Sequence, residues 1–225
     1  MNVLLFGATG MVGQGVLREC LLDPDVALAQ TIGRTATGVQ NAKLREIVHQ
    51  DLLDYTAVQA QLAGFDACFF CLGVTSQGMK EADYHRVTYE LTLSAAHTLV
   101  GLNPQMTLVF VSGVGTDSSE RGPRMWARVK GKTENALLRL PFRAAYMFRP
   151  GLIMPLHGIR SKTPLYRNLY TITQPILPML RRLLRDQILT TEELGRAMLV
   201  AAKRGAPESV LETRDIRRLI ASPAA

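Results

Sequence analysis

The sequence predicts an α/β fold: a doubly wound parallel sheet in one domain spanning residues 1–225. Apolar segments of strand length alternate with segments of helical periodicity through the first two thirds of the chain. The first apolar run, Val3–Phe6, continues directly into a glycine-rich turn. The chain has 225 residues, 47% of them hydrophobic, which is enough for one well-buried domain of this kind.

The glycine-rich turn is the strongest local signal. Gly7 permits a tight turn, Gly10 lets the backbone approach a phosphate, and Gly13 lets the next helix pack on the sheet. N–H groups at the start of that helix are unpaired and attract an anion, together with the helix dipole. Strand, turn and helix in this order are typical of a Rossmann fold, although a glycine-rich loop can also serve chain reversal alone. We expect a dinucleotide pyrophosphate to bind Gly7, Thr9, Gly10, Met11, Val12 and Gly13.

The remaining elements follow in alternation, as right-handed crossovers between parallel strands require. We predict strands near 2–6, 28–33, 45–49, 66–71, 106–112 and 143–148. Helices are predicted near 11–22, 54–62, 80–101 and 124–139. Prolines interrupt the pattern after residue 150, so residues 151–190 are expected to form a small C-terminal lobe that covers the substrate. Thr190 and Glu193 form a capping box that begins a helix through Ala202.

Candidate cofactor ligands follow the second and third strands. Arg34 stands where a site for NAD usually carries an acidic residue, and a guanidinium there favours the 2′-phosphate of NADP. The alternative is a solvated arginine at a strand end. Asp51 can accept a hydrogen bond from the adenine amino group, with Leu52 offering its backbone, or it can cap a helix.

The fourth strand ends in Cys71-Leu72-Gly73-Val74. Gly73 would let the backbone pass close to the ribose and phosphates, so Leu72, Gly73 and Val74 are also expected cofactor contacts. Cys68 and Cys71 have the spacing of a metal or redox pair. Side chains three apart on a strand face opposite sides, so we expect buried core cysteines and no metal site.

Charge and composition limit the partners. The net charge of +7 and the pI near 9.6 favour anionic ligands, but no DNA-reading or RNA-binding pattern is present. A polyphosphate cofactor and a small-molecule substrate account for the charge, and we expect no nucleic-acid partner. No basic and apolar leader precedes the first strand, and no run reaches membrane-spanning length, so the expected location is cytoplasmic.

These motifs resemble the short-chain dehydrogenase/reductase superfamily, in its atypical branch of small NAD(P)-binding, epimerase-like proteins. The resemblance extends from residue 3 to about residue 155. It rests on the glycine turn, Arg34, Asp51, Cys71–Gly73, Val129–Glu134 and Phe148–Gly151.

The resemblance implies a catalytic serine, a tyrosine and a lysine four residues after it. Lys130 matches the lysine, which binds the nicotinamide ribose; Ser112 is the candidate serine, with Thr116 as the second choice. The tyrosine position holds Trp126, whose indole does not ionise usefully and therefore cannot act as an acid or base.

Other residues could replace the tyrosine. His85, Tyr84 and Tyr89 begin the long helix that borders the same cleft in relatives, although each also fits a helix-surface or core position. The resemblance further implies that Pro150, Gly151 and Ile153 hold the nicotinamide end, unless this segment is a simple turn.

The segment from Pro164 to Arg185 mixes leucine and isoleucine with arginine. It fits a lid over an apolar substrate or a contact in a homo-oligomer better than a membrane-surface patch, because Pro175 and Pro178 interrupt any continuous amphipathic helix.

Two functions remain open. The first is an NADP-dependent oxidoreductase or epimerase-like enzyme acting on a small carbonyl or hydroxyl compound. The second is a non-catalytic NADP(H)-binding sensor or regulatory protein, which the tryptophan at position 126 favours.

Overall fold

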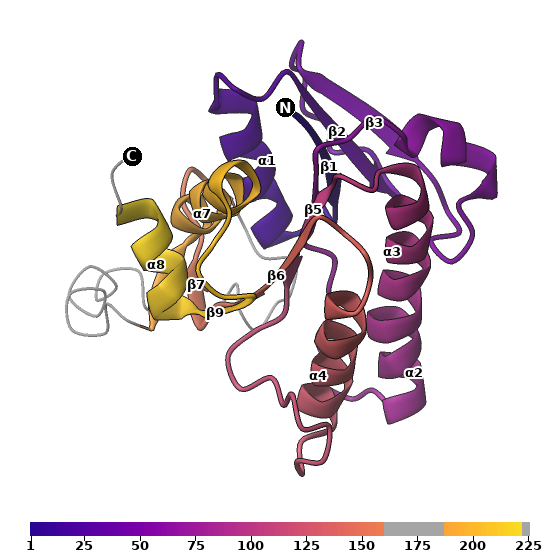
Figure 1. Cartoon of the computed structure of the whole chain (residues 1–225), viewed down its shortest axis with the longest axis vertical. Coiled ribbons are helices and arrows are strands. Elements are labelled where there is room, and N and C mark those ends of the chain that lie inside the picture. Colours follow the sequence, from indigo (N-terminus) through magenta and orange to yellow (C-terminus); the bar gives the residue numbers. More distant parts are fainter. Residues whose placement is uncertain (160–186, 222–225) are drawn as a thin grey trace.

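A computed structural model describes residues 1–159 and 187–221. Its centre is a seven-stranded, fully parallel sheet with strand order β3-β2-β1-β4-β5-β6-β9 (Figure 1). The order reverses direction between β1 and β4, so the crevice beside the carboxyl end of β1 is the place where such sheets bind ligands. The predicted doubly wound Rossmann fold is confirmed.

The strands agree closely with the hydrophobic runs in the sequence. They are β1 (Asn2–Phe6), β2 (Leu28–Gly33), β3 (Leu44–Val48), β4 (Ala67–Phe70), β5 (Thr107–Val111), β6 (Ala144–Arg149) and β9 (Val210–Glu212). A second, two-stranded parallel sheet consists of β7 (Leu152–Met154) and β8 (Ile188–Thr190).

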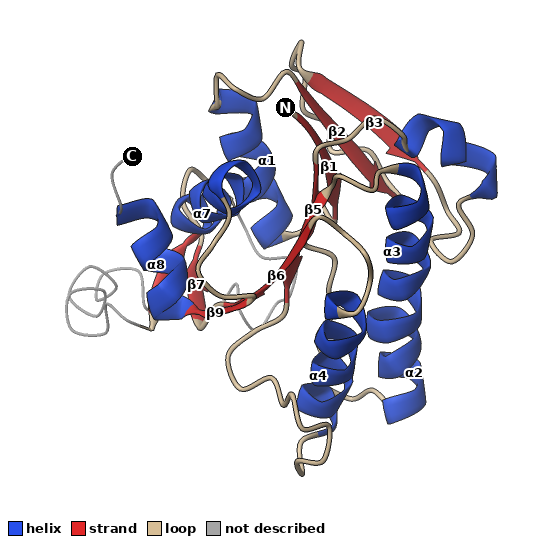
Figure 2. Cartoon of the chain, in the orientation of Figure 1, coloured by secondary structure: helices blue, strands red, loops and turns tan. Residues whose placement is uncertain are grey.

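Helices cover both faces of the large sheet (Figure 2). On one side lie α1 (Met11–Leu22), α7 (Thr191–Arg204) and α8 (Thr213–Ala221). On the other lie η1 (Thr56–Leu62), α2 (Glu81–His85), η2 (Arg86–Glu90), α3 (Leu91–Leu102) and α4 (Met125–Leu138).

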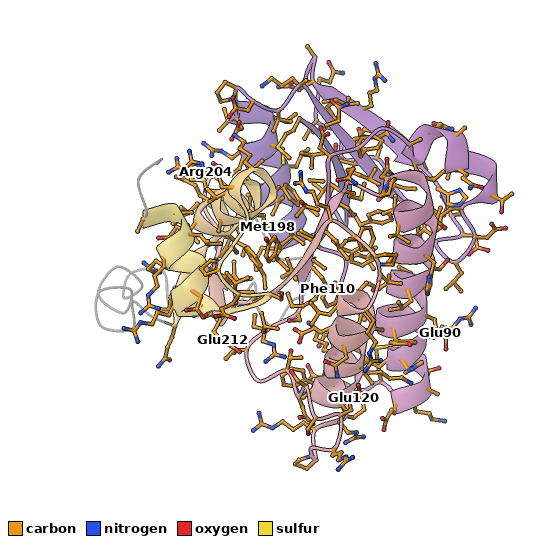
Figure 3. All side chains as sticks on the ribbon, viewed as in Figure 1. Glu90, Phe110, Glu120, Met198, Arg204 and Glu212 are labelled. Atoms are coloured by element: carbon orange, nitrogen blue, oxygen red, sulfur yellow. The ribbon has the colours of Figure 1, made fainter. Side chains whose placement is uncertain are left out.

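Alternation along β1 divides the core into two layers. Val3 and Leu5 pack with α1 and α7, whereas Leu4 and Phe6 pack with the opposite helices. Met198 of α7 and Phe110 of β5 belong to these two layers, and Figure 3 labels both, with Arg204 and Glu90 at the periphery. Cys68 and Cys71 also lie on opposite faces, as the strand spacing predicts.

Three helical segments differ from the sequence prediction. The segment predicted as a helix over 54–62 is the 3₁₀-helix η1. The long helix predicted over 80–101 contains one π-helical turn, η2, where the Thr92 hydroxyl donates to the carbonyl oxygen of Thr88. Strands β7, β8 and β9 and helix α8 were not predicted.

The predicted capping box is confirmed. The Thr190 hydroxyl accepts a hydrogen bond from the Glu193 N–H at 3.0 Å, and the Glu193 carboxylate accepts from the Thr190 N–H at 2.8 Å. Helix α7 therefore begins where the sequence indicates. Most of the predicted covering lobe at 151–190, including the Pro164–Arg185 segment, lies outside the described residues.

Candidate functional site

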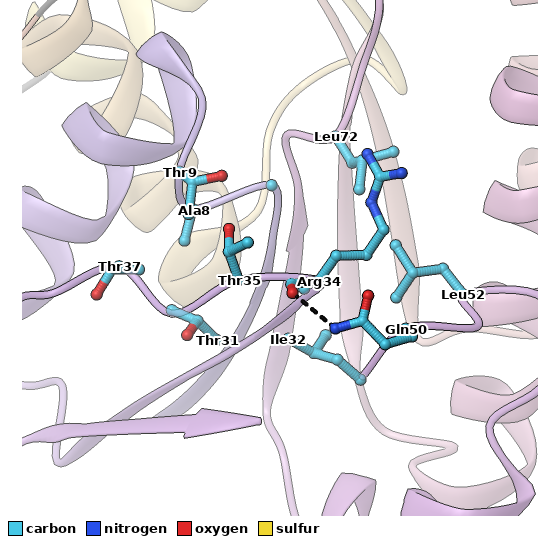
Figure 4. A pocket seen from close by; sticks show the side chains of 12 residues that line it. Ala8, Thr9, Thr31, Ile32, Arg34, Thr35, Thr37, Gln50, Leu52 and Leu72 are labelled. Atoms are coloured by element: carbon cyan, nitrogen blue, oxygen red, sulfur yellow. Dashed lines mark hydrogen bonds between the residues drawn. The ribbon is translucent and has the colours of Figure 1, made fainter. Parts of the chain in front are cut away.

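A pocket of about 440 Å³ opens at the carboxyl ends of β1, β2, β3 and β4 (Figure 4). This volume falls in the usual range for small-molecule sites. Its lining comes from four segments that are far apart in the sequence: Gly7, Ala8, Thr9, Thr31, Ile32, Gly33, Arg34, Thr35, Thr37, Gln50, Leu52 and Leu72.

The glycine turn is fixed by close backbone contacts. Gly7 has φ +78°, and a Cβ there would lie 2.6 Å from the backbone nitrogen of Leu72. A Cβ on Gly13 would lie 2.1 Å from the carbonyl oxygen of Gly7. Both positions exclude a side chain, so β1, the turn and α1 approach each other as the sequence predicts.

Helix α1 begins at this turn without a side-chain cap. Its N-cap is Gly10, and among the described residues no side chain caps its first N–H groups. Gly10 itself donates to the carbonyl oxygen of Gly7 at 2.9 Å. The N–H groups of Met11, Val12 and Gly13 form an anion-attracting helix start at the edge of the pocket.

Arg34 extends across the pocket toward Leu72 (Figure 4). Its backbone oxygen accepts a hydrogen bond from the Gln50 side chain at 2.9 Å, which fixes the backbone there. Its guanidinium has no ion-pair partner among the residues that the structure describes. The exposed cation and the hydroxyls of Thr35 and Thr37 together suit an anionic group.

Only some of the residues expected to contact the adenine line the pocket. Leu52 and Leu72 line the pocket, whereas Asp51 does not. The Asp51 carboxylate accepts a hydrogen bond from the Leu53 N–H at 2.9 Å, which is a turn-capping contact. Gly73 and Val74 are exposed just beyond Leu72 and outside the pocket lining.

Lys130 lies on α4, and its ammonium donates to the backbone oxygen of Ser112 at the end of β5. The contact places the ammonium at the carboxyl edge of the sheet, on the side where the glycine turn lies. Burial lowers the pKa of Lys130 to about 8, while the Glu134 carboxylate acts in the opposite direction.

The Ser112 side chain is directed into the protein. Its hydroxyl donates to Glu134 and also lies 3.2 Å from the carbonyl oxygen of Phe148. Thr116, the second candidate, donates to the carbonyl oxygen of Gly113 at 2.7 Å. Neither hydroxyl is free to orient a substrate in this arrangement.

Trp126 lies one helical turn before Lys130, and its ring edge is 3.5 Å from where a Cβ on Gly115 would stand. Val74 and Val114 follow the adjacent strands β4 and β5 by four and three residues and are 45% and 57% exposed. The carboxyl ends of β4 and β5 therefore present an apolar surface.

Two of the alternative proton-transfer residues, His85 and Tyr89, lie beside Lys132. His85 Nε2 is 3.2 Å from Lys132 Nζ, and Lys132 also covers the Tyr89 ring. Residues two apart on a helix point about 200° apart, so this cluster lies on the opposite side of α4 from Lys130. Tyr84 is only 2% exposed, and burial raises its pKa.

The segment after β6 turns away from the pocket. The carbonyl oxygen of Pro150 accepts from the Val114 N–H at 2.9 Å. The Gly151 N–H donates to Thr213 at 2.8 Å, and Ile153 pairs with β8. The main-chain bonds of Pro150 and Gly151 join elements of the protein, and none of the three residues lines the pocket.

Sequence reasoning missed Gln50, Thr35 and Thr37 as pocket residues and Glu134 as a buried partner of Ser112. Polar residues directly after β2 and β3 could have indicated the first group. Glu134 is four residues after Lys130, and this i,i+4 spacing places both on one face of α4.

No family model matches the chain. It is 30% identical over 159 residues to "Protein fmp52, mitochondrial" of Emericella nidulans, an alignment covering 68% of this chain and 66%, just under two thirds, of that protein. It is 26% identical over 225 residues to "Protein fmp52-2, mitochondrial" of Aspergillus oryzae, covering 96% of this chain and 95% of that protein. The expectation of a cytoplasmic location is wrong by this comparison, because these relatives are named as mitochondrial proteins.

Solved structures share the fold at low identity. The NAD⁺ complex of the enzyme WbmF from Bordetella bronchiseptica has a TM-score of 0.66 at 15% identity, covering 98% of this chain and 76% of that one. The UDP-N-acetylglucosamine 4-epimerase of Methanobrevibacter ruminantium has a TM-score of 0.69 at 14% identity, covering 94% and 75%. Within residues 1–159 and 187–221, no helix has the length and apolar character needed to cross a membrane.

Proposed function

We propose that the chain is a member of the short-chain dehydrogenase/reductase superfamily, in its atypical branch, and that it is an NADP-dependent oxidoreductase or epimerase-type enzyme. Its substrate is a small carbonyl or hydroxyl compound. The observation that carries this proposal is the pocket that is lined both by the glycine turn after β1 and by Arg34.

The residues present fit a dinucleotide. The uncapped start of α1 and the turn from Gly7 to Gly13 suit the pyrophosphate. Arg34, with Thr35 and Thr37, suits the 2′-phosphate that distinguishes NADP from NAD, because a guanidinium binds phosphate oxygens with paired hydrogen bonds. Leu52 and Leu72 offer apolar contact to the adenine. When bound, the nicotinamide supplies or accepts hydride.

Lys130 is the residue best suited to hold and transfer the proton. Trp126 cannot ionise, and His85 and Tyr89 lie on the opposite side of α4. A pKa near 8 gives Lys130 substantial populations of both protonation states close to neutral pH, as an acid or base catalyst requires. The same ammonium can donate to the ribose hydroxyls.

The substrate is apolar near its reacting group. Val74 and Val114 are exposed at the ends of adjacent strands, and Trp126 lies against Gly115 close by. Such a surface favours a hydrocarbon or aromatic substituent over a sugar.

The test is NADPH oxidation with a panel of aliphatic and aromatic aldehydes and ketones, run beside matched hydroxylated compounds. The proposal expects turnover of apolar carbonyls that Lys130→Ala abolishes. Lys132→Ala, which removes the same charge from the other side of α4, is the control and should retain turnover. Absence of turnover with every compound, while NADPH still binds, would contradict an enzymatic role.

That outcome would favour the second candidate function, a non-catalytic NADP(H) sensor. Trp126 is the observation that favours it, because an indole at the acid/base position preserves packing without proton transfer. A gain of reductase activity in Trp126→Tyr, from an inactive wild type, would support the sensor.

A further inference from the structure

A continuous set of hydrogen bonds connects β6 to the ammonium of Lys130. Arg149 Nε lies 3.1 Å from both carboxylate oxygens of Glu134, and Arg149 Nη2 also donates to the Glu134 carboxylate. Glu134 accepts from the Ser112 hydroxyl, and the Ser112 carbonyl oxygen accepts from Lys130. The order is Arg149, Glu134, Ser112, Lys130.

The two charges at the start of this set are buried. The Glu134 side chain is 1% exposed and that of Arg149 is 11% exposed. A buried carboxylate is costly unless it is paired and hydrogen-bonded, and here Arg149 and Ser112 satisfy it. Arg149 is further held by Ser118 at 2.6 Å and lies 3.4 Å from Glu212.

Ser112 binds Glu134 and Lys130 through different atoms. Its hydroxyl binds Glu134, while its carbonyl oxygen holds Lys130. Its N–H donates to the carbonyl oxygen of Phe148 at 2.8 Å, so the whole residue is fixed between α4 and β6. The bond to Glu134 is therefore one of the contacts that hold Ser112, and with it the carbonyl that receives Lys130.

We propose that Glu134 is a positioning residue of the site: through Ser112 it holds the Lys130 ammonium at the cofactor edge of the sheet, and its negative charge lies on the same face of α4 as Lys130. This inference rests on the proposed function, because it assumes that Lys130 contacts NADP(H). In this arrangement Ser112 holds Lys130 in position and does not orient the substrate.

The other charges near α4 are engaged elsewhere. Arg149 from β6 meets Glu134 and Glu212. On the α2 side, Glu81 pairs with Arg128 at 2.7 Å. His85 and Glu90 lie by Lys132, on the opposite side of the helix from Lys130. Glu134 is thus the carboxylate that acts on Lys130.

The test measures NADPH affinity against pH, from about pH 6 to pH 10, by the fluorescence of the bound nucleotide. In the wild type, affinity should fall about tenfold or more as pH rises through 8, because the charged hydrogen bond from Lys130 is lost. In Glu134→Gln the fall should occur at lower pH, since the neutral amide no longer favours the charged lysine. Glu134→Asp should move the fall back toward the wild-type pH.

Two variants complete the experiment. Glu212→Gln removes another carboxylate beside Arg149, but one that is 47% exposed and not bonded to Ser112, and should keep the wild-type profile. If Glu134→Gln fails to fold, Ser112→Ala breaks the link while leaving the Arg149–Glu134 pair, and should weaken NADPH binding below pH 8.

The outcomes separate the two proposals. A folded Glu134→Gln with the wild-type pH profile, or Ser112→Ala with wild-type affinity, overturns the positioning role. Wild-type protein that does not bind NADPH at any pH overturns the proposed function instead. Circular dichroism and thermal unfolding establish that each variant is folded.

Discussion

Gly13 stands so close to Gly7 that a Cβ at position 13 would lie 2.1 Å from the carbonyl oxygen of residue 7. The contact joins the first turn of α1 to the end of β1. It fixes the uncapped start of α1 beside the pocket. The same close packing that stabilises the fold therefore also positions the N–H groups that would bind an anion.

Gly13→Ala should therefore destabilise the protein and weaken NADPH binding together. Overpacking at a backbone contact costs about 1–3 kcal/mol, to be measured as the free energy of unfolding in urea. Gly101→Ala is the control, because a Cβ there meets nothing within 4 Å in α3, and should be neutral or stabilising. Equal stabilities of the two variants would contradict the close contact.

Arg149→Met should lower the free energy of unfolding by about 3 kcal/mol, because it leaves the buried Glu134 charge unpaired. Arg196→Met removes a 60% exposed arginine that bridges Glu19 and Glu192, and should cost less than about 1 kcal/mol. Urea unfolding measures both. A loss in Arg149→Met no larger than in Arg196→Met would mean that the buried pair contributes little.

Lys130→Met should change how stability depends on pH. The folded pKa is lowered to about 8, against about 10.4 for a lysine in an unfolded chain. Between these values the unfolded state holds more protons, so the wild-type free energy of unfolding gains a contribution that rises with pH. The variant lacks this contribution, so its stability relative to wild type should be highest below pH 8 and should decline above it. Urea unfolding at several pH values would show a constant difference if the prediction is wrong.

Trp126→Phe should leave turnover of an apolar carbonyl within a few-fold of wild type, with the same pH dependence, because the indole transfers no proton. Steady-state NADPH oxidation provides the measurement. Loss of the acidic or basic limb of the pH profile in this variant would show that position 126 takes part in proton transfer after all.

The sequence was sufficient for the main sheet and for the glycine turn because both depend on short-range patterns. An apolar strand, glycines at fixed spacing and a periodic helix occur in order from Val3 to Leu22, and Thr190 with Glu193 marks the start of α7. The three residues of β9, Val210–Glu212, are too few to show a period, and their strand identity comes from pairing with β6.

The centre of the candidate site was less predictable. Whether Ser112 faces the cleft or Glu134 depends on how β5 and α4 are placed against each other, which no local pattern records. In the sequence Glu134 resembles an exposed residue of a helix. Its contact with Arg149 depends on how β6 packs against α4. The placement of His85 was also beyond local patterns, because its contact with Lys132 joins residues 47 apart in the sequence.

The most direct test of the account is calorimetric titration of the wild type and Arg34→Ala with NADPH and NADH. We predict micromolar binding of NADPH to the wild type, and about tenfold or greater weakening in Arg34→Ala, with little change for NADH. Arg45→Ala, an exposed arginine on β3 outside the pocket, should bind NADPH as the wild type does. Failure of the wild type to bind either nucleotide would contradict the central claim that this pocket holds NADP.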